Sequence, residues 1–169
     1  MKICSFFGHR KIDMNNDLKQ RVKDCVEDLI VKCNVKTFLF GSKSNFNDLC
    51  HLVVSELKEK YPHIQRYAYT CRSETCALEK ERAYWEEIYS HFQKRPVTLL
   101  GVEEEIEHKT KWTSGKVQYI ERNQATIDNS DFCVFYYNEN YIPPTKTNSG
   151  TFLAYKYAIR KKKTVINLS

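Results

Sequence analysis

The chain has 169 residues, of which 41% are hydrophobic and 28% charged, and its formal net charge is +6. These values predict one soluble globular domain that is large enough to bury a core. No run of about 18 apolar residues occurs, which excludes a membrane-spanning helix. The apolar run over residues 1–7 is too short for a signal peptide and predicts a first strand, so the expected location is the cytoplasm.

Seven cysteines are scattered along the chain. Their odd number and irregular spacing argue against a disulfide framework. Four of them fall in predicted strands or on the apolar face of a predicted helix and are expected in the core: Cys4, Cys25, Cys33 and Cys133. Cys71 and Cys76 are separated by four residues, unlike a zinc-binding pair, and no second pair follows, so neither a metal site nor a cofactor is predicted.

The first half of the chain alternates between predicted strands and helices. Continuous apolar runs predict the strands, and apolar residues at helical spacing predict the helices. The expected elements are strands over 2–7, 36–40 and 64–70, and helices over 17–33 and 46–61.

The second half is less regular, because a polar stretch follows the third strand. A helix is expected over 78–92 and a strand over 97–100, whereas 102–117 has no clear pattern. The chain then ends with a helix over 118–129, a strand over 132–137, a loop, and a last helix and strand (164–168). This alternation predicts an α/β fold with a mainly parallel sheet and helices on both faces, in a single domain over 1–169 with a helical or charged insertion at about 71–117.

Three glycine-bearing turns are expected to meet at one edge of the sheet, because ligands of open α/β sheets bind beyond the carboxyl ends of the strands. Gly8-His9-Arg10 follows the first strand, Gly41-Ser42-Lys43-Ser44-Asn45 follows the second, and Asn148-Ser149-Gly150-Thr151 opens the last helix. Glycine lets the backbone approach a ligand, and free N–H groups at a helix start favour an anion such as phosphate.

The residue types in these turns suit a phosphorylated ligand. They supply two cations and three hydroxyl groups: Arg10, Lys43, Ser42, Ser44 and Thr151. Asp48, one turn into the second helix, suits a ribose hydroxyl. His9 is expected to stay neutral beside Arg10, either as a hydrogen-bonded strand-end residue or as a catalytic one. The structural alternatives are ordinary turn glycines, helix caps and solvated charges.

Two charged segments have an open role. The basic run at 160–163 either contacts a polyanion such as nucleic acid or forms a solvated helix C-terminus. Glu103-Glu104-Glu105 is expected to be a solvated face, and Trp85, Tyr89 and Phe92 at helical spacing are expected in the core or at a dimer face.

Neither a G-x-G-x-x-G fingerprint nor a P-loop occurs. The chain nevertheless resembles the SLOG superfamily (the SMF/DprA and LOG group), and within it the YpsA-like branch of Gram-positive bacteria and their phages. The motifs that carry this resemblance are Ile3–Phe7 with Gly8-His9-Arg10, Phe40-Gly41 with Phe46-Asn47-Asp48, Glu121-Arg122-Asn123-Gln124 before Ile127–Asp131, and Ser149-Gly150-Thr151 with Ala154, Tyr157-Ala158 and Val165–Leu168.

The resemblance implies a Rossmann-like domain that binds nucleotides or nucleotide-derived ligands. By matching motifs it assigns the ligand loops to Gly8 and Arg10, Gly41 to Asp48, Arg122 and Asn123, and Ser149-Gly150-Thr151. The phosphoribohydrolase branch carries a glutamate four residues after the loop glycine, where this chain has Ala154. Alanine cannot act as an acid or a base.

Three functions follow from these observations. The first is binding of a phosphorylated, nucleotide-like small molecule, for example an ADP-ribose-type signal, by a sensor, regulator or sequestering protein in phage defence or anti-defence. The second is N-glycosidic hydrolysis, with Asp48, Glu121 and Arg122 as candidate catalytic residues. The third is single-stranded nucleic acid binding through aromatic and basic residues. The resemblance also implies a homodimer or a higher homo-oligomer, and no membrane partner is expected.

Overall fold

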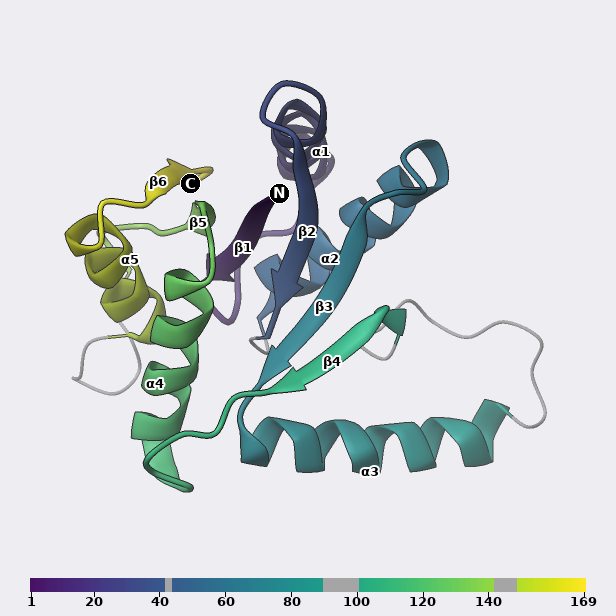
Figure 1. The fold of residues 1–169 in the computed structure, drawn as a ribbon, viewed down its shortest axis with the longest axis vertical. Helices are drawn as coiled ribbons and strands as arrows, with labels where there is room; N and C mark the ends of the chain where they lie inside the picture. The colour runs from purple at the N-terminus through teal and green to yellow at the C-terminus, as the bar shows by residue number, and fades with distance from the viewer. Residues whose placement is uncertain (42–43, 90–100, 142–148) are drawn as a thin grey trace.

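Six parallel strands build one sheet in the part of the chain that the structure describes, in the order β4-β3-β2-β1-β5-β6 (Figure 1). The structure is a computed structural model and describes residues 1–41, 44–89, 101–141 and 149–169. The strands are β1 (Lys2–Gly8), β2 (Val35–Phe40), β3 (Gln65–Thr70), β4 (Glu104–Glu107), β5 (Phe132–Tyr136) and β6 (Thr164–Asn167). The helices are α1 (Asn16–Val31), α2 (Asn45–Lys60), α3 (Arg72–Tyr89), α4 (Gly115–Asp128) and α5 (Gly150–Arg160). The predicted α/β fold, with its Rossmann-like parallel sheet, is confirmed.

The elements predicted for the first half of the chain are all present, with ends within two residues of the expected positions. Side-chain caps explain where the two helices begin. The Asn15 side chain accepts a hydrogen bond from the N–H of Leu18, and the Ser44 hydroxyl accepts one from the N–H of Asn47. Each cap satisfies a backbone donor that has no partner inside its helix.

The second half differs from the prediction at three places. Helix α3 begins at Arg72, six residues before the expected Leu78, because the Glu74 carboxylate accepts the N–H of Cys71 at 3.0 Å and closes the first turn. Helix α4 begins at Gly115 rather than residue 118, and strand β4 lies in the segment without a clear pattern. The polar segment thus supplies an edge strand of the sheet. The strand expected over 97–100 lies outside the described residues, as do Phe92 and the side chains of Trp85 and Tyr89.

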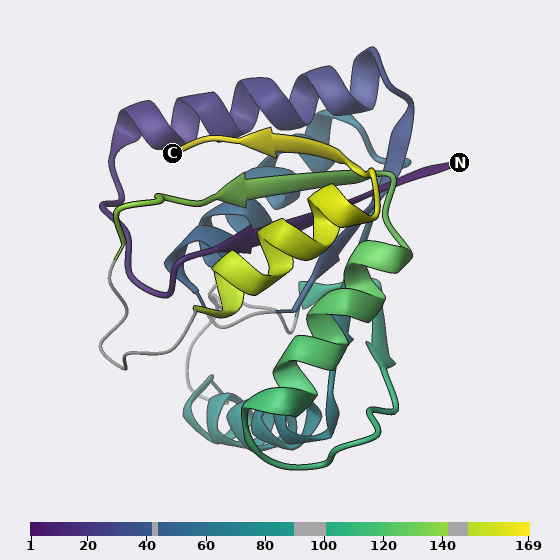
Figure 2. The ribbon, with the colours of Figure 1, turned by 90° about the vertical axis from the view of Figure 1, so that its left-hand side faces the viewer.

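Two apolar layers lie on opposite faces of the sheet. The larger one packs α1 and α2 on the sheet through residues such as Phe6, Phe38 and Phe40. The smaller one packs α5 on the other face through Phe7 and Phe135. Figure 2 shows α4 and α5 on the near face of the sheet and α2 behind it. Because side chains alternate along a strand, Phe6 and Phe7 of β1 enter different layers.

Helix α4 buries mostly polar side chains, with Ile127 as its fully buried apolar residue. Gln118, Arg122 and Thr126, spaced four residues apart, are each at most 3% exposed. The Ser130 hydroxyl after the helix lies 2.9 Å from the Ser5 hydroxyl of β1. This i, i+4 spacing aligns the stripe along one face of α4. The part of the core under α4 is therefore held by polar contacts.

The direction in which successive strands are added to the sheet reverses at β1, although all strands run parallel. The segment from β1 to β4 builds the sheet outward on one side of β1, and β5 then pairs with β1 on its other side. A crevice for a ligand forms at such a switch point, outside the carboxyl ends of the strands. The turns after β1 and β5 are therefore the first places to look for a site.

Candidate functional site

His9 lies at the switch point and is only 3% exposed. Its N–H extends the strand pairing by donating to the carbonyl oxygen of Tyr136, and its Nε2 accepts the N–H of Asn138 at 3.0 Å. The neutral ring therefore carries its proton on Nδ1, which has no hydrogen-bond partner. Burial lowers the pKa of His9, so the ring is neutral as expected, but not because of the neighbouring Arg10.

Aromatic rings link His9 to the start of α5. The ring stacks on Tyr141 with centroids 4.0 Å apart and lies 5.9 Å from Tyr137, which in turn lies 6.2 Å from Phe152 in the first turn of α5. Strand alternation also places His9 on the same face as Phe7, which packs with α5. The unpartnered Nδ1–H therefore belongs to the region around the N-terminus of α5.

The fold itself requires two of the three predicted site glycines. A Cβ on Gly8 would lie 2.5 Å from Cβ of Phe46, and a Cβ on Gly41 would lie 2.3 Å from the backbone oxygen of Tyr69. Real Cβ atoms do not tolerate such contacts. Close packing of β1 on α2 and of β2 on β3 thus explains both glycines without a ligand.

Gly150 is different. It does not have a positive φ angle, and a Cβ built on it would meet no atom of the described residues within 4 Å. Ser149 caps α5 by accepting the N–H of Phe152 at 3.0 Å, so the cap does not depend on the glycine. Among the described residues, neither packing nor backbone conformation therefore explains this glycine.

A small pocket with room for about one water molecule lies between α4 and α5 at this point. Its lining residues are Ile120, Asn123, Gln124, Gly150, Leu153 and Ala154. The structure thus brings together Asn123 and Gly150, which are far apart in the sequence. Ala154, at the position of the hydrolase glutamate, is 2% exposed and presents only a methyl group to the pocket.

Arg122 lies against Gly41, but its guanidinium is already engaged. Nε and Nη2 donate to the two carboxylate oxygens of Glu74 at 3.0 and 2.6 Å, and Nη1 donates to Oδ1 of Asn123. Arg122 and Glu74 are both buried. The pair ties α4 to the start of α3, so a ligand anion that used Arg122 would compete with Glu74.

The remaining predicted residues lie around this edge with fewer contacts. Arg10 is exposed, and its carbonyl oxygen accepts the N–H of Asn45 at 3.1 Å. Asp48 is exposed in the first turn of α2, and Thr151 follows Gly150 in α5. Glu121 accepts the N–H of Lys111 at 2.6 Å. Ser42 and Lys43 lie outside the described residues.

Two further buried polar residues lie near these turns: Asn47, which belongs to the Gly41–Asp48 segment that the resemblance assigns to the ligand, and Glu74, which the sequence did not single out. Asn47 is fully buried at the start of α2, and neither its amide oxygen nor its amide nitrogen has a hydrogen-bond partner. Glu74 had a weak signal, since it lies three residues after Cys71, the spacing of a capping box.

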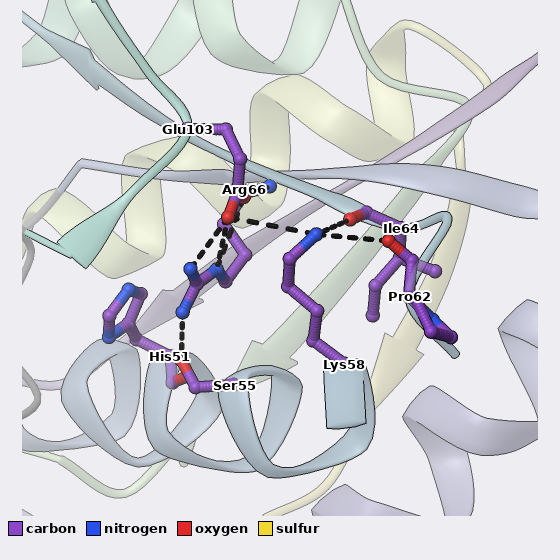
Figure 3. Close-up of polar contacts among 7 residues, drawn as sticks. All are labelled: His51, Ser55, Lys58, Pro62, Ile64, Arg66 and Glu103. Carbon is purple, nitrogen blue, oxygen red and sulfur yellow. Dashed lines mark hydrogen bonds and ion pairs between the residues drawn. The ribbon is translucent and has the colours of Figure 1, made fainter. Parts of the chain in front are cut away.

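A second polar cluster lies away from the switch point, between α2, β3 and the start of β4 (Figure 3). Arg66 donates to both oxygens of Glu103 and, at 2.8 Å, to the Ser55 hydroxyl. Lys58 donates to the carbonyl oxygen of Ile64 at 2.5 Å. Glu103, Glu104 and Glu105 are all exposed, as expected, and the Glu103 carboxylate in addition ties the residue before β4 to Arg66 of β3.

The C-terminal basic run lies at the opposite, amino edge of the sheet, directly before β6. Lys161 pairs with the carboxylate of Asp128 at 3.4 Å, and Lys163 donates to the carbonyl oxygen of Asp128 at 3.0 Å. Both lysines thereby cap the C-terminus of α4, as cations commonly do. The run therefore takes the structural role that the sequence left open.

Within the described ranges, no three or more His, Cys, Asp or Glu residues are grouped so that they could hold a metal ion. None of the helices described is long and apolar enough to span a membrane.

Comparison with known proteins supports the fold. No family model and no curated protein matches the sequence. Among solved structures, the chain is similar to DNA processing protein A from Helicobacter pylori, with a TM-score of 0.55 and 10% sequence identity. The match covers 98% of this chain but 64% of that protein, which is described as having a unique single-stranded DNA binding mode. At this identity the likeness shows a shared fold.

Proposed function

We propose that this protein binds a nucleotide or nucleotide-derived ligand at the carboxyl edge of the sheet, with a phosphate at the N-terminus of α5. Gly150 carries the proposal, because it is the site glycine that neither packing nor backbone conformation requires. A side chain there would fill the space beside the first N–H groups of the helix, where an anion is favoured.

Neighbouring groups would complete the ligand site. The Nδ1–H of His9 is a buried donor with no partner in the part of the chain that the structure describes, and such groups are uncommon unless something binds them. The exposed guanidinium of Arg10 adds a positive charge and a planar pair of donors for phosphate. Asn123 lines the pocket beside Gly150. Asp48 remains our candidate for a ribose hydroxyl.

The arrangement favours binding over cleavage. Ala154 provides no acid or base in the pocket, Arg122 is paired with Glu74, and Glu121 holds the backbone of Lys111. A hydrolase would need a carboxylate near the glycosidic carbon. We therefore place the protein with sensors, regulators or sequestering proteins of the SLOG superfamily, in its YpsA-like branch, with ADP-ribose-type compounds as the first ligands to test and a homo-oligomer as the expected assembly.

Thermal unfolding in the presence of AMP, ADP-ribose, NAD and cyclic ADP-ribose isomers tests the proposal. A ligand at 100 times its Kd stabilises the folded state by about 2.7 kcal/mol. For a chain of this size that corresponds to a rise in Tm of about 5–10 °C. Chromatography of the ligand after incubation should recover it intact. If none of these compounds raises Tm, the nucleotide site is refuted; release of free base would show the N-glycosidic hydrolase instead.

Single-stranded nucleic acid is the second candidate ligand. The observation that favours it is the fold shared with DNA processing protein A, which binds single-stranded DNA. Binding that weakens steeply with added salt would be its signature.

A further inference from the structure

A buried ion pair reaches the candidate site through Asn123. Nε and Nη2 of Arg122 donate to the two carboxylate oxygens of Glu74 at 3.0 and 2.6 Å, and Nη1 donates to Oδ1 of Asn123. Arg122 is 3% exposed and Glu74 is 7% exposed, so solvent does not compete for this bidentate pair. Because the guanidinium is planar and rigid, the pair also fixes the direction of Nη1, which ends on a side chain that lines the pocket beside Gly150.

Gly41 makes room for this arrangement. A Cβ at position 41 would lie 3.3 Å from Nη1 of Arg122, in addition to its clash with the backbone of Tyr69. An alanine would therefore press on the same nitrogen that donates to Asn123. The glycine after β2 thus allows the close approach of Arg122.

The bond from Arg122 determines which end of the Asn123 carboxamide faces the pocket. Arginine only donates hydrogen bonds, so the end that faces Nη1 is the accepting Oδ1, and the NH2 group lies at the other end of the same planar group. Asn123 follows Arg122 by about 100° around α4, which turns it toward α5, the neighbouring helix in Figure 2. Among the described residues, this NH2 group has no hydrogen-bond partner. The pocket beside Gly150 is thus lined by an amide donor that protein contacts hold in place.

His9 is fixed as a donor in the same way. The N–H of Asn138 occupies its Nε2 at 3.0 Å, so the neutral ring carries its proton on Nδ1. His9 and Asn123 each have their accepting atom occupied by the protein and present a donor. An ionised phosphate oxygen only accepts hydrogen bonds, and the pocket beside Gly150 has room for about one water molecule, which is also the size of one such oxygen.

We propose that Asn123 donates through its NH2 group to an anionic phosphate oxygen of the ligand, and that Arg122 and Glu74 are positioning residues that hold this amide in place. The inference rests on the phosphate site proposed at the start of α5 and assigns one of its donors. Arg122 does not contact the ligand and acts through Oδ1 of Asn123. The group that the site selects is therefore one that only accepts hydrogen bonds, an ionised phosphate and not the amino group of a base.

Titration of the full chain with inorganic phosphate, followed in proton–nitrogen NMR correlation spectra, tests the contact. The side-chain NH2 signal of Asn123 should shift together with the backbone N–H signals of Thr151 and Phe152 at the start of α5. Shifts of the two backbone signals without Asn123 would leave the phosphate site in place and overturn the role of Asn123. If none of these signals moves, the phosphate site itself fails, and the inference fails with it.

The Kd of variants for inorganic phosphate tests the positioning role. Asn123→Ala should raise Kd about 10- to 100-fold. Asn123→Asp keeps an oxygen for Arg122 but replaces the donor by a carboxylate oxygen, so it should weaken binding at least as much. The double variant Glu74→Leu/Arg122→Leu keeps the net charge and leaves the amide free to rotate, which should raise Kd about 2- to 10-fold. The matched control, Arg66→Leu/Glu103→Leu, removes an ion pair at the other end of β3 and should leave Kd unchanged.

A double-mutant cycle separates positioning from direct contact. In the Asn123→Ala background, the leucine pair at 74 and 122 should cause no further loss, because the amide that it would release is gone. Losses that multiply would show that Arg122 contacts the phosphate itself and would overturn the inference, as would an Asn123→Asp variant that binds as well as the unchanged chain. Thermal unfolding of each variant separates a binding defect from a folding defect, and the leucine pair leaves no buried carboxylate without a partner.

Discussion

Alanine at Gly41 and alanine at Gly150 should have opposite effects on stability, because the space around the two glycines differs. At Gly41 the new methyl group would lie 2.3 Å from the Tyr69 carbonyl oxygen, which belongs to β3 and cannot move away cheaply. Overpacking of this kind costs about 1–3 kcal/mol, which lowers Tm by about 2–12 °C. At Gly150 the methyl group meets nothing within 4 Å, and alanine favours a helix over glycine by about 1 kcal/mol, so Tm should rise by about 2–4 °C.

The Gly150→Ala substitution, which should raise Tm, should at the same time weaken ligand binding. Gly150→Ala places a methyl group beside the N–H groups that would hold the phosphate. The loss of a hydrogen bond to a charged group costs about 1.5–3 kcal/mol, which raises Kd about 10- to 100-fold. Gly101→Ala is a matched control, because this glycine is also exposed with no neighbour within 4 Å.

Differential scanning fluorimetry with and without the best nucleotide measures both quantities. A rise in Tm together with a lost ligand shift would support the role of Gly150. A fall in Tm for Gly150→Ala would show that the fold does require the glycine, and an unchanged Kd would remove the phosphate from this turn.

Three further changes test the buried polar groups. Burial and the neighbouring Arg66 lower the pKa of His51 from 6.5 to about 4, so the ring is neutral in the folded state. The free energy of unfolding should therefore fall by about 3 kcal/mol as the pH drops from about 6.5 to 4, because the unfolded state gains a proton first. Urea unfolding of the His51→Phe variant should lack that part of the pH dependence. The Arg122→Ala variant leaves the buried Glu74 carboxylate without its ion pair and should lower the free energy of unfolding by urea by about 3–5 kcal/mol. The double variant with leucine at both positions should recover much of that loss. An equal loss in the single and the double variant would contradict a paired role. Asn47→Leu removes a fully buried amide without partners and should raise stability by about 1–3 kcal/mol; a decrease would reveal a contact that the amide makes.

Local sequence patterns predicted the strands and helices correctly in the part of the chain where each element packs through apolar side chains. The alternating runs over 2–70 matched the observed strands and helices closely, because burial on a parallel sheet demands continuous apolar strands. The prediction failed where polar groups do the packing. Strand β4 reads as Glu104-Glu105-Ile106-Glu107, yet it pairs with β3 at the sheet edge, where ion pairs such as Arg82 with Glu105 satisfy its carboxylates.

The candidate site shows the same division. The turns after β1 and before α5 were predicted from glycines and hydroxyl groups alone, since a helix start after a strand has the same chemistry in any such fold. The distance from each glycine to its neighbours in the fold decides whether packing already explains that glycine. Gly8, Gly41 and Gly150 look alike in the sequence, and only the approach of Phe46 and of Tyr69 separates the first two from the third.

Short-range chemistry along the chain thus determined the strands, most helix starts and the positions of the turns. Tertiary structure alone decided that Arg122 is paired with Glu74, that His9 keeps a donor without a partner among the described residues, and that the lysines at 161 and 163 contact the last residue of α4. The physical reason is that these contacts join residues 33 or more positions apart in the sequence; Arg122 and Glu74 are separated by 48. Helix propensity and apolar spacing act within a few residues and therefore predict helices and strands. They do not predict which distant charged residue will lie beside a given side chain in the folded chain.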